Sequence, residues 1–404
     1  MSVYVKRELS NLISEALENM PVVVLSGMRQ TGKSTLLKNQ PEIKGYPYFT
    51  FDDFGTLEAA KRNPRQFVEQ NEKMIIDEVQ KLPAILPVIK QSVDNKRVPG
   101  RYILSGSANI LLLKNVSESL AGRAIYLTLK PFTRREIFNS NKEPFLVDLL
   151  NSKKVDDRKF IDIKWKEIVT GGMPSVCLRE TKKPAFWFRG YEQTYLERDI
   201  RGLTQVADIM SFRNLLQLLA LRNASVLNQS ELARDSKLNA MTTGRYLSLL
   251  ETTFVINRLQ PYLRNHSSRL IKSPKVYISD TGLVFHLLGL NESSAVERFK
   301  GALYENYVFQ NIQSILLSHL PDSKLYYWNI QSRHEVDFIV ENGDETFAIE
   351  VTSSSSWQAK DLSGLNAFMA SSKNCKIGIV AYAGEKVLQL DKNIWAIPIA
   401  LLLS

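Results

Sequence analysis

One short stretch limits what this chain can fold into more than any other part of it. An apolar run, PVVVLSG at residues 21–27, passes directly into the glycine-rich turn MRQTGKST at residues 28–35. Together they give the pattern G-x-x-x-x-G-K-S between an expected strand and an expected helix. The two glycines let backbone amides turn toward phosphate oxygens, and the helix N-terminus adds a partial positive charge. The pattern therefore predicts an α/β fold in which a parallel sheet carries a phosphate-binding loop.

The side chains at the end of this loop suit a nucleoside triphosphate and its metal ion. Lys33 is long enough to reach the β- and γ-phosphates, and Ser34 offers a hydroxyl to Mg²⁺. We therefore predict ATP and Mg²⁺ as cofactors. The residues expected to contact the nucleotide are Gly27, Met28, Arg29, Gln30, Thr31, Gly32, Lys33, Ser34 and Thr35.

A second apolar run ends in two acids, in the sequence KMIIDEVQ at residues 73–80. Asp77 is placed at the strand end to hold Mg²⁺, and Glu78 is placed to polarise the attacking water. This pair favours hydrolysis over binding alone. Asp52 and Asp53 follow another expected strand, YFTFDD, where they either face the site or end the strand with turn chemistry.

Two further features follow in the same region. The run RYILSGSAN ends in small polar residues, where parallel sheets place their ligands, so Ser105 or Ser107 is either a γ-phosphate sensor or part of a plain strand-to-helix turn. Arg123 follows a glycine and precedes a strand. It is either an arginine finger that acts on a neighbouring subunit's phosphoryl group or one half of a structural ion pair.

A series of motifs runs through nearly the whole chain. In order they are GMRQTGKST, MIIDEVQ, ILSGSAN, SLAGR, GGMPS, YLERDI, SPKVYISDTGL, YENYVFQNI, EVDFIV and AIEV. This order resembles a widespread family of bacterial and archaeal ATPases with an AAA-type core and a C-terminal domain of unknown function; YLERDI and KVYISDTGL are its specific markers. The resemblance implies an AAA+-like P-loop core, a winged helix and a restriction-endonuclease-like α/β domain, and it supplies no substrate.

We accordingly expect four parts. They are a P-loop AAA+-like core at 1–140, a helical lid or linker at 141–204, a winged helix at 205–290 and a degenerate PD-(D/E)xK-like domain at 291–404. Within YLERDI, the charges of Glu197, Arg198 and Asp199 are either functional or a salt-bridged helix face.

The expected winged helix has three helical runs followed by a β-ribbon. The runs are FRNLLQLLALRN, NQSELARDSKL with Ser230 as N-cap, and NAMTTGRYLSLLETT with Arg245 exposed. The third suits a recognition helix in a major groove of DNA, and a basic loop at 264–275 would meet phosphates of DNA or RNA. Protein docking and packing between domains are the alternatives. The basic residues of the loop are Arg264, His266, Arg269, Lys272 and Lys275.

The C-terminal part contains two expected strands, EVDFIV and FAIEVT, joined by the hairpin turn NGD. Strict alternation would place Glu335 and Asp337 on one face of the sheet, and Val336, Phe338 and Val340 on the other.

This hairpin would bring Asp337 and Glu350 together in the layout of a PD-(D/E)xK nuclease, where they and Glu305 would hold a second metal ion. The position of the nuclease lysine is occupied by Thr352, which supplies no positive charge, and Lys360 is the alternative lysine. We interpret the acids as a retained metal site without efficient chemistry; the alternative is a purely structural acidic hairpin.

Composition narrows the setting. Lys and Arg total 52 against 42 Asp and Glu, and this net charge of +10 favours polyanionic partners. No run reaches the roughly 18 apolar residues of a membrane span, and the first residues lack the apolar core of a secretion signal. Cys177 and Cys375 have no metal-ligand spacing. We therefore expect a cytoplasmic protein with no membrane attachment.

These observations lead to one main hypothesis. The chain is expected to be a homo-oligomeric, Mg²⁺-dependent AAA+-type ATPase that couples nucleotide state to nucleic-acid or partner engagement by its C-terminal half. The alternatives are an ATP-gated PD-(D/E)xK nuclease and a nucleotide-dependent protein-interaction switch in defence or toxin control.

Overall fold

The computed structural model describes residues 4–106, 120–156, 158–196, 209–263, 272–290, 294–330 and 333–404. The chain divides into two compact units. One consists of Met1–Lys130 with Thr252–Phe254, and the other of Pro131–Glu251 with Val255–Ser404. Across the described residues, no helix is both long enough and apolar enough to span a membrane.

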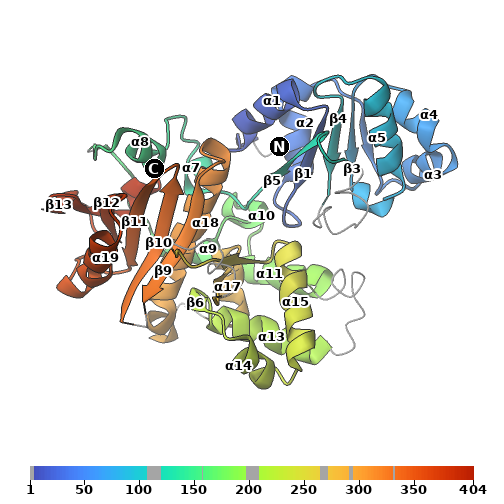
Figure 1. Ribbon diagram of the computed structural model, residues 1–404. Helices are drawn as coiled ribbons and strands as arrows, with labels where there is room; N and C mark the ends of the chain where they lie inside the picture. Colours follow the sequence, from blue (N-terminus) through green and yellow to red (C-terminus); the bar gives the residue numbers. More distant parts are fainter. Residues whose placement is uncertain are drawn as a thin grey trace. The chain divides into compact units, whose positions relative to one another are not determined.

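The first unit is built on a five-stranded sheet in the order β2-β3-β4-β1-β5 (Figure 1). Every pairing in it is parallel, which confirms the predicted α/β fold. Since parallel strands end at the same edge, the residues after β1, β3 and β4 lie near one another. The strands are β1 (Val22–Ser26), β2 (Tyr48–Thr50), β3 (Met74–Asp77), β4 (Tyr102–Ser105) and β5 (Ala124–Thr128).

Helices cover both faces of this sheet, which explains why its strands are apolar almost throughout. Val22 and Val24 pack in a core cluster with α3, α4 and α5, whereas Val23 and Leu25 pack in a second cluster with α1 and α2. The elements are α1 (Ser10–Asn19), α2 (Lys33–Asn39), α3 (Phe54–Arg62), α4 (Pro64–Glu69), α5 (Ile85–Asn95) and the short 3₁₀ turns η1 (Pro41–Ile43) and η2 (Val79–Lys81).

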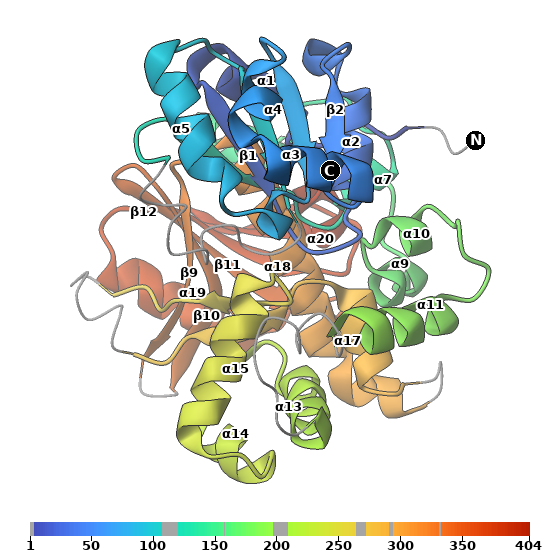
Figure 2. The same ribbon diagram turned by 90° about the vertical axis from the view of Figure 1, so that its right-hand side faces the viewer.

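The second unit begins with short helices and continues with a small helical and β-ribbon region. In that region α13, α14 and α15 lie together (Figure 2). The same region contains an antiparallel three-stranded sheet in the order β6-β8-β7. The elements are α7 (Arg134–Ile137), α8 (Phe145–Ser152), α9 (Trp165–Thr170), α10 (Pro174–Cys177), α11 (Pro184–Tyr191), the π-helical turn η4 (Glu192–Leu196), α13 (Ile209–Leu221), β6 (Ser225–Val226), α14 (Gln229–Asp235), α15 (Ala240–Thr252), β7 (Ile256–Leu259), β8 (Lys275–Ile278) and α17 (Thr281–Leu287).

The N-cap of α14 differs from the prediction. Asn228, and not Ser230, begins the helix, because its side-chain oxygen accepts a hydrogen bond from the Glu231 amide at 3.1 Å. Ser230 lies within the first turn.

The chain ends in a six-stranded sheet in the order β13-β14-β12-β11-β10-β9, against which α18 and α19 pack (Figure 1). The predicted hairpin joins β10 and β11, and Gly343 in its turn has φ +60°. The elements are η5 (Ser294–Phe299), α18 (Lys300–His319), β9 (Lys324–Ile330), β10 (His334–Asn342), β11 (Glu345–Thr352), α19 (Ala359–Ser371), β12 (Cys375–Tyr382), β13 (Leu388–Asp391), β14 (Ile394–Pro398) and α20 (Ile399–Leu402).

The predicted alternation along β10 is wrong at its centre. Pairing with β9 shifts register between Val336 and Ile339, as at a β-bulge. As a result Val336 and Ile339 belong to one core cluster with α19, whereas Phe338 packs on Phe309 of α18, with ring centroids 6.1 Å apart. Val336 and Phe338 therefore do not share a packing surface.

Candidate functional site

The turn after β1 has the backbone geometry of a phosphate-binding loop. Gly27 has φ +144° and Gly32 has φ +92°, values that favour glycine. A Cβ atom on Gly27 would lie 2.3 Å from the carbonyl oxygen of Leu129, so no other residue fits at this position. Backbone conformation therefore explains the glycine at both positions, and at Gly27 the close contact with Leu129 is a second reason.

The side chain of Lys33 binds the backbone of the loop. Its ammonium donates hydrogen bonds to the carbonyl oxygens of Gly27 at 2.8 Å and Met28 at 2.9 Å, and its side chain is buried. Burial lowers the pKa of Lys33 from 10.5 to about 8, against the opposing attraction of Glu78 and Asp77. The positive charge is therefore held inside the loop, at the place where phosphate oxygens are expected.

Ser34 and Asp77 meet across the edge of the sheet. The Ser34 hydroxyl donates to Oδ2 of Asp77 at 2.7 Å, and Asp77 is buried at the end of β3. A hydroxyl and a carboxylate in contact are the two protein ligands expected for Mg²⁺ beside a nucleotide. The two motifs therefore meet at this edge of the sheet.

Tyr48 also binds this carboxylate, which the sequence did not reveal. Its hydroxyl donates a hydrogen bond to the same Oδ2 atom of Asp77. Tyr48 begins β2, which pairs with β3 so that Tyr48 lies opposite Ile75. Burial and the bond to Asp77 raise the pKa of Tyr48, so the phenol stays neutral and remains a donor.

Glu78 has a left-handed backbone, with φ +56°. Such a conformation costs energy in a residue with a side chain and is frequent at functional sites. The Glu78 amide donates to Oδ1 of Asp77 at 3.0 Å, and the Gln80 amide group donates to the Glu78 carboxylate. Asp77 therefore holds the backbone of Glu78, and Gln80 holds the carboxylate that is predicted to polarise water.

Arg7 is a second residue that the sequence did not single out. Its guanidinium donates to the carbonyl oxygen of Thr31 in the loop at 2.8 Å and to that of Lys130 after β5 at 2.6 Å. The side chain is buried. Arg7 therefore joins the loop to the neighbouring strand from a segment that precedes α1.

Asp52 and Asp53, at the end of β2, end the strand with turn chemistry. Asp53 caps α3 by accepting from the Thr56 amide at 2.7 Å, and Asp52 pairs with Lys81 at 2.5 Å. Neither contact involves the loop.

Arg123 forms the structural ion pair that was one of its two interpretations, with Nε 2.5 Å from Asp94. It precedes Ala124, which pairs with Val22 at the start of β1, so it lies at the end of the sheet opposite its own loop. As an arginine finger, Arg123 would therefore have to act on the nucleotide of a neighbouring copy. This role stays a prediction.

Of the two candidate sensor serines, Ser105 is described. It is fully buried at the end of β4, and its hydroxyl has no hydrogen-bond partner among the described residues. Ser107 lies outside the described residues. So do Glu197, Arg198, Asp199, Arg264, His266 and Arg269.

A second group of charged side chains lies in the C-terminal unit, around Lys275. The Lys275 ammonium is 3.0 Å from Oε1 of Glu305 and 3.0 Å from Oδ1 of Asp337, and it also pairs with Glu335. The Lys275 side chain is 2% exposed. Lys275 was predicted to meet phosphates in a basic loop; this prediction is wrong, because the side chain is buried among carboxylates.

Asp337 and Glu350 are brought together as the hairpin predicted. The pairing of β10 with β11 ends at Phe338 and Ile349, and beyond it the Val351 amide donates to Oδ2 of Asp337 at 2.9 Å. Burial, and then the charge of Asp337, raise the pKa of both Glu305 and Glu350 well above the ordinary value.

The lysine at these acids is not the one expected. Lys360 is exposed at the start of α19, and Thr352 lies at the end of β11. Among the described residues no group of three or more His, Cys, Asp or Glu side chains is arranged to hold a metal ion. The second metal site therefore stays a prediction, while the ammonium of Lys275 is present among its proposed ligands.

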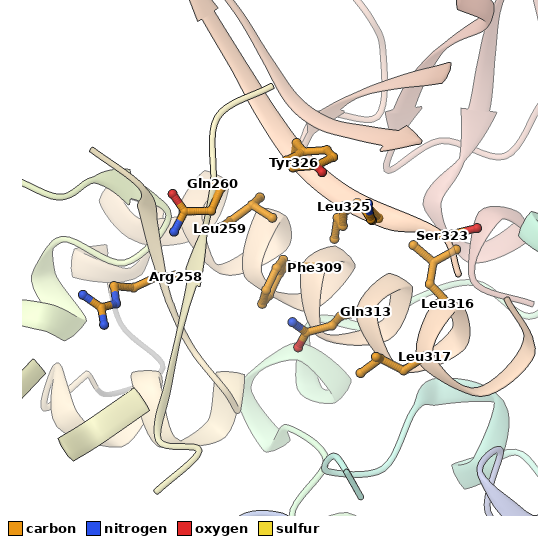
Figure 3. Close-up of a pocket in the computed structure, with 11 residues that line it drawn as sticks. Arg258, Leu259, Gln260, Phe309, Gln313, Leu316, Leu317, Ser323, Leu325 and Tyr326 are labelled. Carbon is orange, nitrogen blue, oxygen red and sulfur yellow. The ribbon is translucent and has the colours of Figure 1, made fainter. Parts of the chain in front are cut away.

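A pocket of about 310 Å³ lies between β7, α18 and the start of β9 (Figure 3). Its lining is mostly apolar and contains no Asp, Glu, His or Cys, so we assign no acid–base chemistry to it. The lining residues are Arg258, Leu259, Gln260, Phe309, Gln313, Leu316, Leu317, Ser323, Lys324, Leu325 and Tyr326.

Comparison with known proteins assigns this chain to a family. Residues 19–138 match an AAA domain, residues 164–294 a domain of unknown function (DUF8612) and residues 300–402 another (DUF4143). An uncharacterized protein of Mycobacterium tuberculosis is 30% identical over 398 residues, which cover 97% of this chain and 83% of that protein. The chain belongs to this family of AAA-domain proteins.

Two more distant similarities were found. An uncharacterized protein of Haemophilus influenzae is 24% identical over 361 residues, which cover 82% of each protein. A Walker-type ATPase of Pyrococcus abyssi, a solved structure, is 17% identical with a TM-score of 0.43, and the match covers 70% of this chain and 96% of that one. Membership of the family therefore rests on the 30% identical relative, and the AAA description on the match of residues 19–138.

Two motifs of this AAA-domain protein meet in the second unit, GGMPS and the segment ISDTGL. The Gly172 amide donates to Oδ2 of buried Asp280 at 2.6 Å, and a Cβ atom on Gly171 would lie 2.5 Å from both Asp280 oxygens. Asp280 also caps α17 through the Leu283 amide at 2.9 Å. These motif residues are thus explained by packing and capping.

Proposed function

We propose that this chain is an ATP- and Mg²⁺-dependent ATPase of the AAA+ type. The observation that carries the proposal is the contact between Ser34 and Asp77, 2.7 Å long, beside the buried ammonium of Lys33. The two motifs are 43 residues apart in sequence, and a fold without a nucleotide site has no evident need to bring them together.

Each residue is assigned one task. Lys33 and the loop amides bind the phosphates, and Ser34 and Asp77 would hold Mg²⁺, which when bound neutralises charge that develops on the transferred phosphoryl group. The Glu78 carboxylate accepts a proton from the attacking water, and Gln80 holds this carboxylate by a hydrogen bond. The loop residues from Gly27 to Thr35 surround the phosphates, with Ser107 as the proposed sensor.

Hydrolysis can be tested directly with two substitutions. Lys33→Ala should abolish ATP binding or turnover, whereas Glu78→Gln should bind ATP and fail to hydrolyse it. Hydrolysis at the wild-type rate in both variants would rule out this site as the ATPase centre.

We further propose that the region around α13, α14 and α15 is a winged helix that engages nucleic acid. The order of helices and the β6-β8-β7 sheet support this fold, and Arg245 is exposed on α15. The net charge of +10 supports a polyanionic partner. A protein-interaction switch in defence or toxin control is the competing function.

Salt-dependent binding separates these two functions. If phosphates are contacted, affinity for a DNA or RNA duplex falls steeply as the salt concentration rises. Arg245→Ala should then reduce the slope of the logarithm of affinity against the logarithm of salt concentration by about one. Arg234→Ala on α14 is the matched control, because Arg234 is 75% exposed and is paired with Asp235. Binding that does not respond to salt would favour the protein-interaction switch.

A nuclease activity gated by ATP is supported less well. The β10–β11 hairpin brings Asp337 and Glu350 together, with Glu305 contacting the same lysine as Asp337, which is favourable for a PD-(D/E)xK layout. Thr352 in the lysine position weighs against efficient cutting. Metal-dependent nicking that is lost in Asp337→Ala would establish the activity.

A further inference from the structure

Three carboxylates converge on the ammonium of Lys275. Glu305 comes from α18, and Glu335 and Asp337 come from β10. Each contributes one oxygen to the same ammonium. The ammonium donates hydrogen bonds to Glu305 and Asp337, each at 3.0 Å, and forms an ion pair with Glu335.

Second contacts orient each of these carboxylates. Tyr277 donates to Oε1 of Glu305 at 2.6 Å, the Val351 amide donates to Oδ2 of Asp337 at 2.9 Å, and the Asn329 amide group donates to Oε2 of Glu335 at 3.1 Å. Such outer contacts preorganise ligands around metal ions. The cluster is therefore rigid, and it is directed at one point.

Lys275 is held equally firmly at its backbone. It lies on β8, the central strand of the small sheet, opposite Val226 of β6 and Leu259 of β7. Its side chain then extends to β10 and α18, where it is 2% exposed. The position of the ammonium is thus fixed by pairing on both sides of the strand, by two hydrogen bonds and by one ion pair.

We propose that Lys275 is a resident cation that fills this carboxylate cluster and excludes divalent metal from it. A metal ion binds carboxylate oxygens at about 2.0 to 2.6 Å, so one bound to the same oxygens would lie very close to the ammonium nitrogen. Two positive charges so close, at a lysine side chain that is 2% exposed, repel strongly. Glu350, with one buried oxygen that lacks a partner among the described residues, is available as a further ligand once the ammonium is gone.

This proposal bears on the absence of a lysine at position 352, the lysine position of the PD-(D/E)xK pattern. Thr352 leaves the strand end without a positive charge, and Lys275 brings one to Asp337 from a different sheet. It does not depend on the proposed ATPase, because none of these residues belongs to the loop or to its acids.

Binding of Mn²⁺ to the nucleotide-free full chain tests the proposal, by equilibrium dialysis with calorimetry. Lys275→Ala should gain one saturable Mn²⁺ site, at least tenfold tighter than any that the wild type offers at this cluster, and Lys275→Ala/Asp337→Asn should lose it. Lys272→Ala removes an exposed lysine from the same segment and should gain no site. The absence of a new site in folded Lys275→Ala would overturn the proposal.

A second comparison keeps the test decisive if Lys275→Ala does not fold. Wild type and Asp337→Asn should then bind the same number of Mn²⁺ ions, because the cluster is already filled. One ion fewer in Asp337→Asn would show that the wild-type cluster binds metal, and the proposal would be wrong. Any Mn²⁺ bound at Ser34 and Asp77 is common to both proteins and cancels.

Discussion

The hydroxyl of Ser34 lies 2.7 Å from a carboxylate oxygen of Asp77. Because Mg²⁺ takes oxygen ligands, removal of this hydroxyl should impair the metal-dependent step more than nucleotide binding. We expect Ser34→Ala to lower Mg²⁺-dependent hydrolysis by about 10- to 100-fold. ATP affinity measured without Mg²⁺ should stay near the wild-type value, and a large loss there would show that Ser34 has a different task.

Tyr48 should position Asp77 for the metal. A hydrogen bond to a charged group is worth about 1.5 kcal/mol, or roughly tenfold in an equilibrium. Tyr48→Phe keeps the ring and removes the hydroxyl, so the Mg²⁺ concentration for half-maximal hydrolysis should rise by about tenfold, with little change in ATP affinity. An unchanged Mg²⁺ requirement would mean that the hydroxyl only fills space.

The ammonium of Lys33 leads to a pH prediction. Burial lowers its pKa from 10.5 to about 8, so the unfolded chain binds more protons than the folded one between these values. The contribution of Lys33 to stability should therefore rise with pH across this window.

Phosphates favour the charged form of Lys33, so ATP binding just above pH 8 should take up protons. Calorimetry in buffers of different ionisation enthalpy measures this uptake. Lys33→Arg is the control, because a guanidinium stays charged, and uptake of the same size in that variant would assign the proton to another group.

Gly27 should be far less replaceable than a glycine with similar backbone freedom. Gly27→Ala forces a Cβ atom to 2.3 Å from the Leu129 carbonyl oxygen, whereas Gly45, with φ +98°, has no atom within 4 Å of such a Cβ. We expect Gly27→Ala to lower the free energy of unfolding by more than about 3 kcal/mol and Gly45→Ala by about 1 to 2 kcal/mol. Chemical denaturation compares them, and equal losses would remove the argument from close contact.

Much of the first unit was predictable because its determinants are local. The strand runs are apolar on both faces, the loop follows one of them, and Asp77 ends another, so parallel topology brings these ends together. The contacts of Tyr48 and Arg7 were not predictable. No local pattern around a tyrosine in a strand, or an arginine near the first residues, indicates which residues these side chains contact after folding.

The C-terminal unit shows the same limit more clearly. Period-two alternation predicted the hairpin, yet a bulge near Val336 changes which side chains pack together. Lys275 looked like one more basic residue in a charged loop. Its burial among acids follows from the contact of two sheets that lie far apart in sequence, and no local pattern records it.

The central claim is that Glu78 activates water for ATP hydrolysis at this loop. The most direct test is the steady-state rate of phosphate release by wild type and Glu78→Gln at saturating ATP and Mg²⁺, with bound ATP measured in parallel. We predict that Glu78→Gln retains ATP and releases phosphate at least about 100-fold more slowly. Phosphate release at the wild-type rate, with ATP equally bound, would contradict the account.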